Sequence, residues 1–333
     1  MHVDGSVAPG YGAVVDAMAG CGPGVAVAAF VRGRRVVDLW TTDLSEDTLI
    51  CTWSAVKPVT GACLLLLVDR GRVGLDDSVV DMWPELDDER LLIRHLLTHT
   101  AGRVTVPDVP LVDWDASVAA LAGMQPDWSP GEVVCEHAQT FGHLVGEVVR
   151  RVDGRSLGRF MADELAAPLG LDVHIGVDDA DLARVADTAG LDRSWWEAAR
   201  GDPGSVRYRA MGPWVDVNER SWRQAEIPAV NGHATARGLA LFWRAFLDQR
   251  LPAGVGEPGA TGHDRFVDEV VTWTLAGGRL DGPDIGMGGL GGQWAAARPS
   301  LGLSWAFLTT RIGDHDRAQH VEDALVTSAG TTG

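Results

Sequence analysis

Trp53-Ser54-Ala55-Val56-Lys57-Pro58 is the most informative stretch of this chain, and the apolar run Val59 to Val68 follows it directly. A serine and a lysine three residues apart at the head of a buried helix lie one turn apart on one face, so the Lys57 amine can reach the Ser54 hydroxyl. Burial disfavours the charged form of lysine and lowers its pKa, which suits the amine to act as a base. Ser54 would then be an acyl-accepting nucleophile. The spacing alone also fits a helix-capping serine followed by a surface lysine.

The composition is that of an ordinary globular chain. Of its 333 residues, 46% are hydrophobic and 22% are charged, which is enough apolar material for a large core. The formal net charge is −18, and the longest basic clusters, residues 32–35 and 150–151, are too short to follow a phosphate backbone. We therefore expect a small-molecule substrate and no nucleic-acid partner. The sequence leaves the oligomeric state open.

Signals for secretion and for membrane insertion are not found in the sequence. Residues 1–5 lack a basic region followed by an apolar one, and no apolar run approaches the length of a membrane span. The four cysteines, Cys21, Cys51, Cys63 and Cys135, are too few for a disulfide scaffold and lack the spacing of metal ligands. We expect a cytoplasmic protein with no membrane partner.

One pair of histidines has a spacing that metal sites use. His95 and His99 stand four residues apart in a segment expected to be helical, residues 93–100, so both could face one ion. No third ligand at a suitable spacing accompanies them, and packed histidines are the favoured interpretation. We therefore expect neither a metal nor a cofactor.

Helical and extended patterns alternate along the chain. Residues 24–31 and 35–40 are β-rich runs separated by Arg32-Gly33-Arg34, as in a hairpin, and residues 302–309 form a further strand near the other end. Apolar spacing and breaker residues predict helices over residues 10–19, 57–70, 93–100, 115–123, 140–152, 157–165, 234–247 and 318–326.

Strands at both ends with helices between them imply one sheet built from distant segments. The predicted fold is α/β (α+β), an antiparallel sheet flanked by helices plus a mostly helical lobe. We expect a single catalytic domain over residues 1–333, with an α/β lobe of roughly 1–75 and 255–333 and a helical lobe of roughly 76–254. Residues 194–229, rich in Gly, Pro and Trp, look like a structured excursion over a site. Their tryptophans could line an aromatic pocket or fill the core.

Several further stretches accompany the serine and lysine in a fixed order. They are Val36-Val37-Asp38-Leu39-Trp40, Leu66-Leu67-Val68-Asp69-Arg70-Gly71, residues 93–102, Trp128-Ser129-Pro130-Gly131, residues 140–151, residues 227–233 and Gly288-Gly289-Leu290-Gly291-Gly292. With these stretches the chain resembles, over nearly its whole length, the serine β-lactamase and penicillin-binding-protein superfamily, in particular its class C-like esterase branch. The resemblance implies the β-lactamase/transpeptidase-like fold.

The resemblance also implies a mechanism. Ser54 would attack an ester, amide or lactam carbonyl while Lys57 manages its proton. The backbone N–H of Ser54 and a second donor from the edge strand near Gly289 or Leu290 would hold the oxyanion. Water or an alcohol would then release the acyl group.

Two positions of the expected site depart from the family pattern, and a third differs nearby. Glu136 occupies the place of a tyrosine, and the only tyrosines, Tyr11 and Tyr208, lie far from this motif. Met287 stands where a lysine or histidine is expected, and Gln293 follows where many relatives have serine.

These departures change the chemistry that the pocket can support. Glu136 beside Lys57 would form an ion pair, which favours the charged lysine and weakens it as a base. Glu136 could itself act as acid or base, or the pair could be structural. Loss of the motif-three side chain makes β-lactam drugs poor candidate substrates. Trp53, His137, Met287, Gly289 and Leu290 are expected to contact the substrate.

The sequence thus supports three hypotheses. The first is a serine hydrolase or acyltransferase that acts on a small ester, lactone or acyl-thioester through an acyl-enzyme on Ser54, with Lys57 as base. The second is a non-hydrolytic biosynthetic enzyme that catalyses a cyclisation, rearrangement or elimination with Glu136 and Lys57 as acid and base. The third is a binding protein that has kept the fold and lost turnover.

Overall fold

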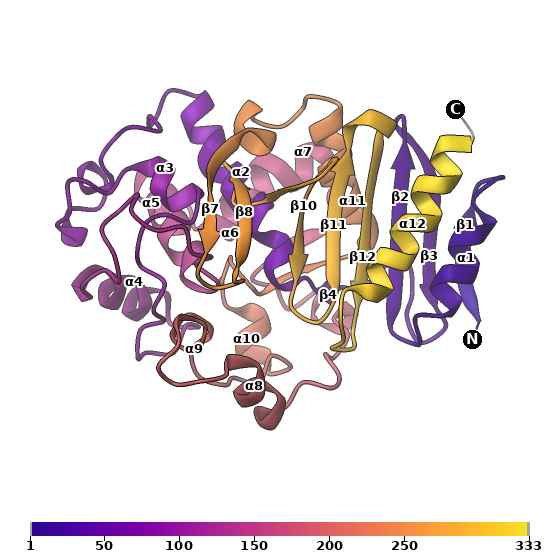
Figure 1. The fold of residues 1–333 in the computed structure, drawn as a ribbon, viewed down its shortest axis with the longest axis horizontal. Coiled ribbons are helices and arrows are strands. Elements are labelled where there is room, and N and C mark those ends of the chain that lie inside the picture. The colour runs from indigo at the N-terminus through magenta and orange to yellow at the C-terminus, as the bar shows by residue number, and fades with distance from the viewer. Residues whose placement is uncertain (1, 332–333) are drawn as a thin grey trace.

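A nine-stranded antiparallel sheet forms the centre of the protein (Figure 1), whose computed structural model describes residues 2–331. Its strands stand in the order β1-β3-β2-β12-β11-β10-β9-β8-β7, so the two ends of the chain meet where β2 pairs with β12. The bounds are β1 Val3–Val7, β2 Val25–Val31, β3 Arg34–Thr41, β7 Pro258–Asp264, β8 Glu269–Thr274, β9 Arg279–Asp281, β10 Asp284–Gly289, β11 Gln293–Arg298 and β12 Leu303–Thr309. The predicted fold class is confirmed.

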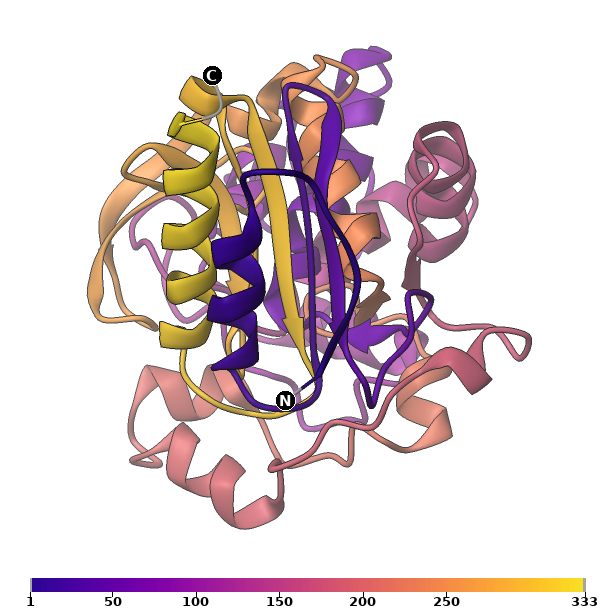
Figure 2. The same ribbon diagram turned by 90° about the vertical axis from the view of Figure 1, so that its right-hand side faces the viewer.

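Helices cover both faces of this sheet (Figure 2). Helices α1 (Gly12–Ala19) and α12 (Asp316–Thr331) lie side by side on one face, where apolar side chains of both helices pack on β2 and β12. On the other face, α11 (Ala236–Leu247) packs against β2, β11 and β12, and α2 (Lys57–Asp69) contacts β10. The central strands are therefore buried on both sides, which explains their nearly continuous apolar sequences.

The remaining elements form a mostly helical region beside the sheet. They are α3 Ile93–Leu97, α4 Trp114–Gly123, α5 Thr140–Asp153, α6 Leu157–Met161, α7 Ala167–Leu169, α8 Arg193–Arg200, α9 Val206–Met211 and α10 Arg220–Gln224. A three-stranded sheet, β4 (Ile50–Cys51), β6 (Gly232–Ala234) and β5 (Val173–Ile175), joins this region to the segment before α2. Helices α2 and α5 pack together in the main core, so the predicted apolar face of residues 140–152 is buried as expected.

One expectation about local structure was wrong. The helix predicted over residues 93–100 ends at Leu97, and His99 has φ 58°, so His95 and His99 do not share a helical face. The helix predicted over 157–165 is present, with a π-helical turn over Ala162–Ala166 after its regular part ends at Met161. Strands β7 to β9 were not predicted, because their glycines and polar residues dilute the alternation that marks a strand.

Helix α2 approaches the sheet region very closely at Gly61. A Cβ atom at this position would lie 2.3 Å from the Ala276 carbonyl oxygen, which is backbone and cannot swing away. Gly61 therefore sets the separation between α2 and the residues that follow β8.

We predict that Gly61→Ala lowers the free energy of unfolding by about 1–3 kcal/mol, because either the helix or the 275–277 backbone must shift to accept the methyl group. Urea unfolding followed by circular dichroism measures the change. The matched control is Gly123→Ala at the end of α4, where a Cβ meets nothing within 4 Å. A Gly61→Ala variant as stable as the Gly123→Ala variant would contradict this packing.

Candidate active site

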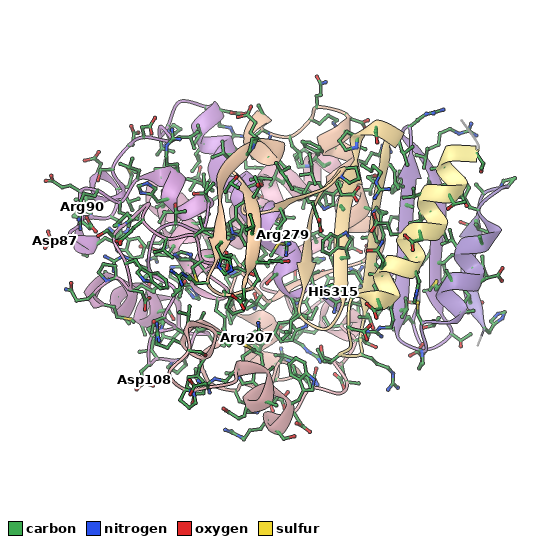
Figure 3. The ribbon with its side chains drawn as sticks, in the orientation of Figure 1. Asp87, Arg90, Asp108, Arg207, Arg279 and His315 are labelled. Atoms are coloured by element: carbon green, nitrogen blue, oxygen red, sulfur yellow. The ribbon has the colours of Figure 1, made fainter. Side chains whose placement is uncertain are left out.

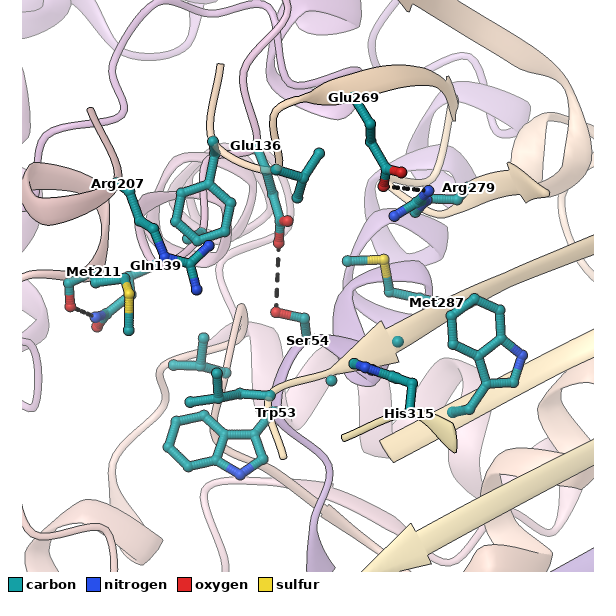
Figure 4. A pocket seen from close by; sticks show the side chains of 18 of the residues that line it. Trp53, Ser54, Glu136, Gln139, Arg207, Met211, Glu269, Arg279, Met287 and His315 are labelled. Carbon is teal, nitrogen blue, oxygen red and sulfur yellow. Dashed lines mark hydrogen bonds and ion pairs between the residues drawn. The ribbon is translucent and has the colours of Figure 1, made fainter. Parts of the chain in front are cut away.

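A pocket of about 400 Å³ opens between the sheet and the helical region (Figure 4). Residues from both regions and from the long excursion line it, including Trp53, Ser54, Glu136, Gln139, Trp196, Arg207, Met211, Phe266, Glu269, Arg279, Met287, Gly289, Leu290 and His315. Six of the eight residues that the sequence suggested therefore line the pocket. The two exceptions, Lys57 and His137, are described below.

Ser54 stands on a tight turn between strand β4 and helix α2. Trp53 has φ 49°, a left-handed backbone conformation that costs a bulky residue about 1–3 kcal/mol. A short 3₁₀ helix, Trp53–Val56, then leads into α2 at Lys57. The Thr52 N–H donates to the Gly232 carbonyl at 2.8 Å, and the Trp53 ring stacks on Trp196 at 6.4 Å. These contacts hold the serine at the floor of the pocket.

Lys57 is completely buried directly beneath Ser54. Its Nζ lies 2.6 Å from Ser54 Oγ and 3.0 Å from Glu136 Oε1, and it donates to the carbonyl oxygens of Ala138 at 3.0 Å and Ala229 at 3.3 Å. A neutral amine has two N–H bonds and one lone pair. When those two bonds point to the two carbonyls, the lone pair is left to accept the proton of Ser54 Oγ, whereas a charged amine has a third N–H bond that it can donate to Glu136.

The electrostatic surroundings of Lys57 act in opposite directions. Burial away from water lowers the pKa of the amine, and this effect is larger than the raising effect of the Glu136 charge and hydrogen bond. The net pKa of Lys57 is therefore lowered. The ion pair with Glu136 that the sequence predicts is present, but it does not bring the pKa of Lys57 back to that of an ordinary lysine. The amine is thus closer to a working base than an exposed lysine would be.

Glu136 faces both members of the pair. Its carboxylate is 7% exposed, lies 3.0 Å from Lys57 Nζ and accepts at 3.5 Å from Ser54 Oγ. The side chain lines the pocket, so a carboxyl group takes the position that the resemblance gives to a phenol. Figure 4 shows it above Ser54, with the contact drawn as a dashed line.

The backbone around Glu136 is fixed by two buried histidines. The His137 N–H donates to His99 Nδ1 at 3.1 Å, and the Cys135 N–H donates to the His99 carbonyl at 3.0 Å. His137 Nε2 accepts from the Arg103 N–H at 3.2 Å, so its Nδ1 carries the proton and donates to the Cys135 carbonyl at 2.8 Å. Burial lowers the pKa of His137 to about 4, which keeps this tautomer neutral.

His137 does not line the pocket, contrary to the expectation from the sequence. Only 1% of the residue is exposed, and both ring nitrogens are engaged by backbone groups. Its contacts position Glu136 instead. Gln293, the other departure from the family pattern, is also buried away from the pocket, where its amide bridges to Thr309 at 2.8 and 2.7 Å.

Strand β10 forms the wall opposite Glu136 and brings its end against the Ser54 turn. A Cβ atom at Gly289 would lie 2.4 Å from the Thr52 carbonyl oxygen, so only glycine permits this approach. Met287 lines the pocket and packs with Val271 and Trp273. The position expected to hold a cation or imidazole therefore presents a thioether and apolar surface.

Other pocket residues were not identified from the sequence. Arg207, Arg279 and His315 come from three separate segments and converge near the middle of the molecule, whereas Asp87, Arg90 and Asp108 lie at its periphery (Figure 3). His315, just before α12, places its Nε2 3.1 Å from where a Cβ at Gly288 would stand, and burial lowers its pKa. None of these residues belongs to a local motif.

One available signal in the sequence was missed. Lys57 is the only lysine in the chain, and the other 27 of its 28 Lys and Arg residues are arginines. Every other side chain among the Lys and Arg residues is a guanidinium, which cannot be deprotonated in proteins. The single amine therefore indicates a role in which this side chain loses a proton.

The described residues offer neither a metal site nor a membrane-spanning helix. Within residues 2–331, no group of three or more His, Cys, Asp or Glu side chains is arranged to hold a metal ion. In the same part of the chain, no helix combines the length and the apolar character that crossing a bilayer requires.

Known proteins resemble this chain in sequence and in fold. Residues 13–327 match the family described as Beta-lactamase. The chain is 28% identical over 370 aligned residues to the Esterase/beta-lactamase LipL of Mycobacterium tuberculosis (strain ATCC 25618 / H37Rv), with 93% of this chain and 83% of that protein covered.

Two solved structures are similar over nearly their whole length. A family VIII carboxylesterase superimposes with a TM-score of 0.87 at 26% identity, covering 98% of this chain and 100% of that one. A penicillin-binding protein homologue from Caulobacter crescentus gives a TM-score of 0.85 at 29% identity, with the same coverage. The chain therefore belongs to the β-lactamase family of serine hydrolases.

Proposed function

We propose that this protein is an esterase or acyltransferase that cleaves a small ester, lactone or acyl-thioester through an acyl-enzyme on Ser54, with Lys57 as the base. The observation that carries the proposal is the 2.6 Å contact between Lys57 Nζ and Ser54 Oγ at the floor of an open pocket. The similarity to an esterase/β-lactamase and to a carboxylesterase supports the same reaction class.

Acylation begins when Ser54 Oγ bonds to the substrate carbonyl carbon and its proton passes to Lys57 Nζ. The oxyanion takes hydrogen bonds from the backbone N–H of Ser54 and from a second backbone N–H where β10 ends, at Gly289 or Leu290. The bond to the alcohol or thiol then breaks, and the leaving group takes up a proton. Water or a second alcohol attacks the ester on Ser54 in the same way and restores the serine.

Glu136 shares one proton with Lys57 in this mechanism. Either the amine is charged and the carboxylate ionised, or the amine is neutral and the carboxyl group holds the proton. In the second state Lys57 can accept the Ser54 proton, and Glu136 can donate to the leaving group. The 3.0 Å contact between Lys57 Nζ and Glu136 Oε1 lets the proton pass between them without movement of the backbone.

The same pair supports a second candidate function. Glu136 and Lys57 are two proton-transfer groups that meet at one pocket, which is what a non-hydrolytic rearrangement, cyclisation or elimination needs. Such an enzyme would keep its activity in Ser54→Ala and lose it in Glu136→Gln. The direct contact of Lys57 with a partly exposed serine favours the acyl-enzyme route.

We predict that p-nitrophenyl butyrate leaves one butyryl group on the protein, located at Ser54 by intact-mass and peptide mass spectrometry. Ser54→Ala should abolish the adduct and reduce kcat/KM by about a thousandfold or more. Lys57→Arg should have an effect of similar size, because the guanidinium keeps its charge but cannot accept the serine proton.

Ser221→Ala is the matched control, since Ser221 is exposed on α10 and away from the pocket. It should retain the adduct and the rate. An adduct that persists in Ser54→Ala, or a Lys57→Arg variant with wild-type kcat/KM, would contradict the acyl-enzyme mechanism.

A second prediction concerns the pH profile of Glu136→Gln. The Glu136 charge raises the pKa of Lys57, so its removal lowers that pKa. The acidic limb of kcat/KM, where Lys57 must lose its proton, should therefore move to lower pH. Loss of the acid should slow an ethyl ester by about 10²–10⁴-fold, and a p-nitrophenyl ester, whose leaving group needs no proton, far less.

We would measure kcat/KM for ethyl butyrate and for p-nitrophenyl butyrate between pH 5 and pH 10, at about every half pH unit. The two profiles give the position of the acidic limb and the loss of rate for each ester. If Glu136→Gln leaves the acidic limb at the same pH and lowers kcat/KM by the same factor for both esters, Glu136 is only a structural partner of Lys57.

A further inference from the structure

Arg207 on helix α9 presents a preorganised guanidinium group to the pocket. Its Nε donates to the Ala199 carbonyl at 2.7 Å, and its central carbon lies 5.1 Å from the centre of the Phe266 ring. The hydrogen bond fixes Nε, and the Phe266 ring covers one face of the guanidinium group. In Figure 4 the guanidinium group points inward, toward the space above Ser54.

The charge of Arg207 is not neutralised by the protein. Within residues 2–331, no Asp or Glu oxygen forms an ion pair with it, although the chain carries 46 acidic residues and a net charge of −18. Two other charged groups of the pocket are paired. Glu136 pairs with Lys57 at 3.0 Å, and Arg279 pairs with Glu269 at 2.8 Å.

The two ends of the pocket therefore differ in charge. Arg279 and Asp281 both belong to β9, and with Glu269 they leave that wall net negative. Arg207 lies on the opposite side of Ser54 in Figure 4 and makes its own wall positive. A substrate with one negative group would be attracted to the Arg207 side and repelled from the β9 side, so the charge also sets its direction.

The surface between these ends is mainly apolar. It is contributed by Trp53, Trp196, Met211, Phe266, Met287 and Leu290. With Nε engaged by the Ala199 carbonyl, the two Nη groups of Arg207 still present one edge, whose parallel N–H bonds match the two oxygens of a carboxylate. The pocket is thus complementary to an apolar molecule that ends in a carboxylate.

We propose that Arg207 binds a carboxylate of the substrate, and that the preferred substrates are esters with an apolar body and a carboxylate remote from the scissile bond. The reaction part of this inference rests on the proposed esterase activity, whereas the binding part does not. The carboxylate can belong to the acyl half or to the alcohol half of the ester.

Two pairs of esters test the acyl half and the alcohol half separately. The members of each pair differ only in whether the remote group is a carboxylate or its methyl ester. For the acyl half, p-nitrophenyl hydrogen glutarate is compared with p-nitrophenyl methyl glutarate. For the alcohol half, 3-butyryloxybenzoate is compared with its methyl ester. In at least one pair, the wild-type kcat/KM should favour the anion by about tenfold or more, as expected for a charge-assisted hydrogen-bonded contact.

Arg207→Gln should bring that ratio to about one, and Arg207→Lys should retain part of it, because the charge remains while the fork is lost. The matched control is the double variant Glu269→Gln/Arg279→Gln, which removes an ion pair of the same pocket without changing its net charge. The control should keep the preference for the anion. A wild-type ratio of one or below in both pairs, or a ratio that Arg207→Gln leaves unchanged, would overturn the proposal.

If neither pair is turned over and no adduct forms on Ser54, the proposed esterase activity fails, and binding still decides the role of Arg207. Isothermal titration of Ser54→Ala with the two anionic esters should then show a Kd about tenfold weaker when Arg207→Gln is added. Equal affinity in the two variants would overturn the carboxylate site independently of catalysis.

Discussion

The burial of a single amine beneath the nucleophile is the constraint on which the rest of the site depends. Lys57 is removed from water and surrounded by two backbone carbonyls, one hydroxyl and one carboxylate, all within 3.3 Å. A charged lysine in such a place costs several kcal/mol unless its partners are fixed. The tight turn at Trp53, the close contact at Gly61 and the two histidines behind Glu136 each fix one part of that environment. The sheet and the helical region therefore act together to hold one nitrogen atom.

The two departures from the family pattern act on different parts of this pocket. At position 136, where the resemblance implies a phenol, a carboxyl group faces both Lys57 and Ser54. At position 287 a thioether replaces a cation or imidazole, which makes the β10 wall apolar. The positive charge that remains free lies instead on α9, at Arg207. The proposed function accounts for both positions by a change of substrate in a site that keeps Ser54 and Lys57.

Much of this arrangement follows from local sequence patterns. The Ser54–Lys57 spacing, the hairpin at residues 32–34 and the buried face of α5 are each encoded within a few turns or one strand pair, and their outcomes agree with expectation. The convergence of Arg207, Phe266 and His315 could not be predicted, because helix α9 and two connections, β7–β8 and β12–α12, meet only after the sheet has formed. His137 was misplaced for a related reason. Its neighbour Glu136 faces the pocket, but the direction of the ring depends on His99, whose left-handed conformation no pattern indicated.

The most direct test of the account is the ionisation of Lys57 itself. Because the chain contains one lysine, protein labelled with ¹⁵Nζ-lysine gives a single side-chain resonance, and its pH titration reports the pKa of this amine alone. The account predicts a pKa below that of an ordinary lysine, and a further decrease in Glu136→Gln, where the raising effect of the carboxylate is gone. A pKa at or above the ordinary value, unchanged by Glu136→Gln, would contradict it.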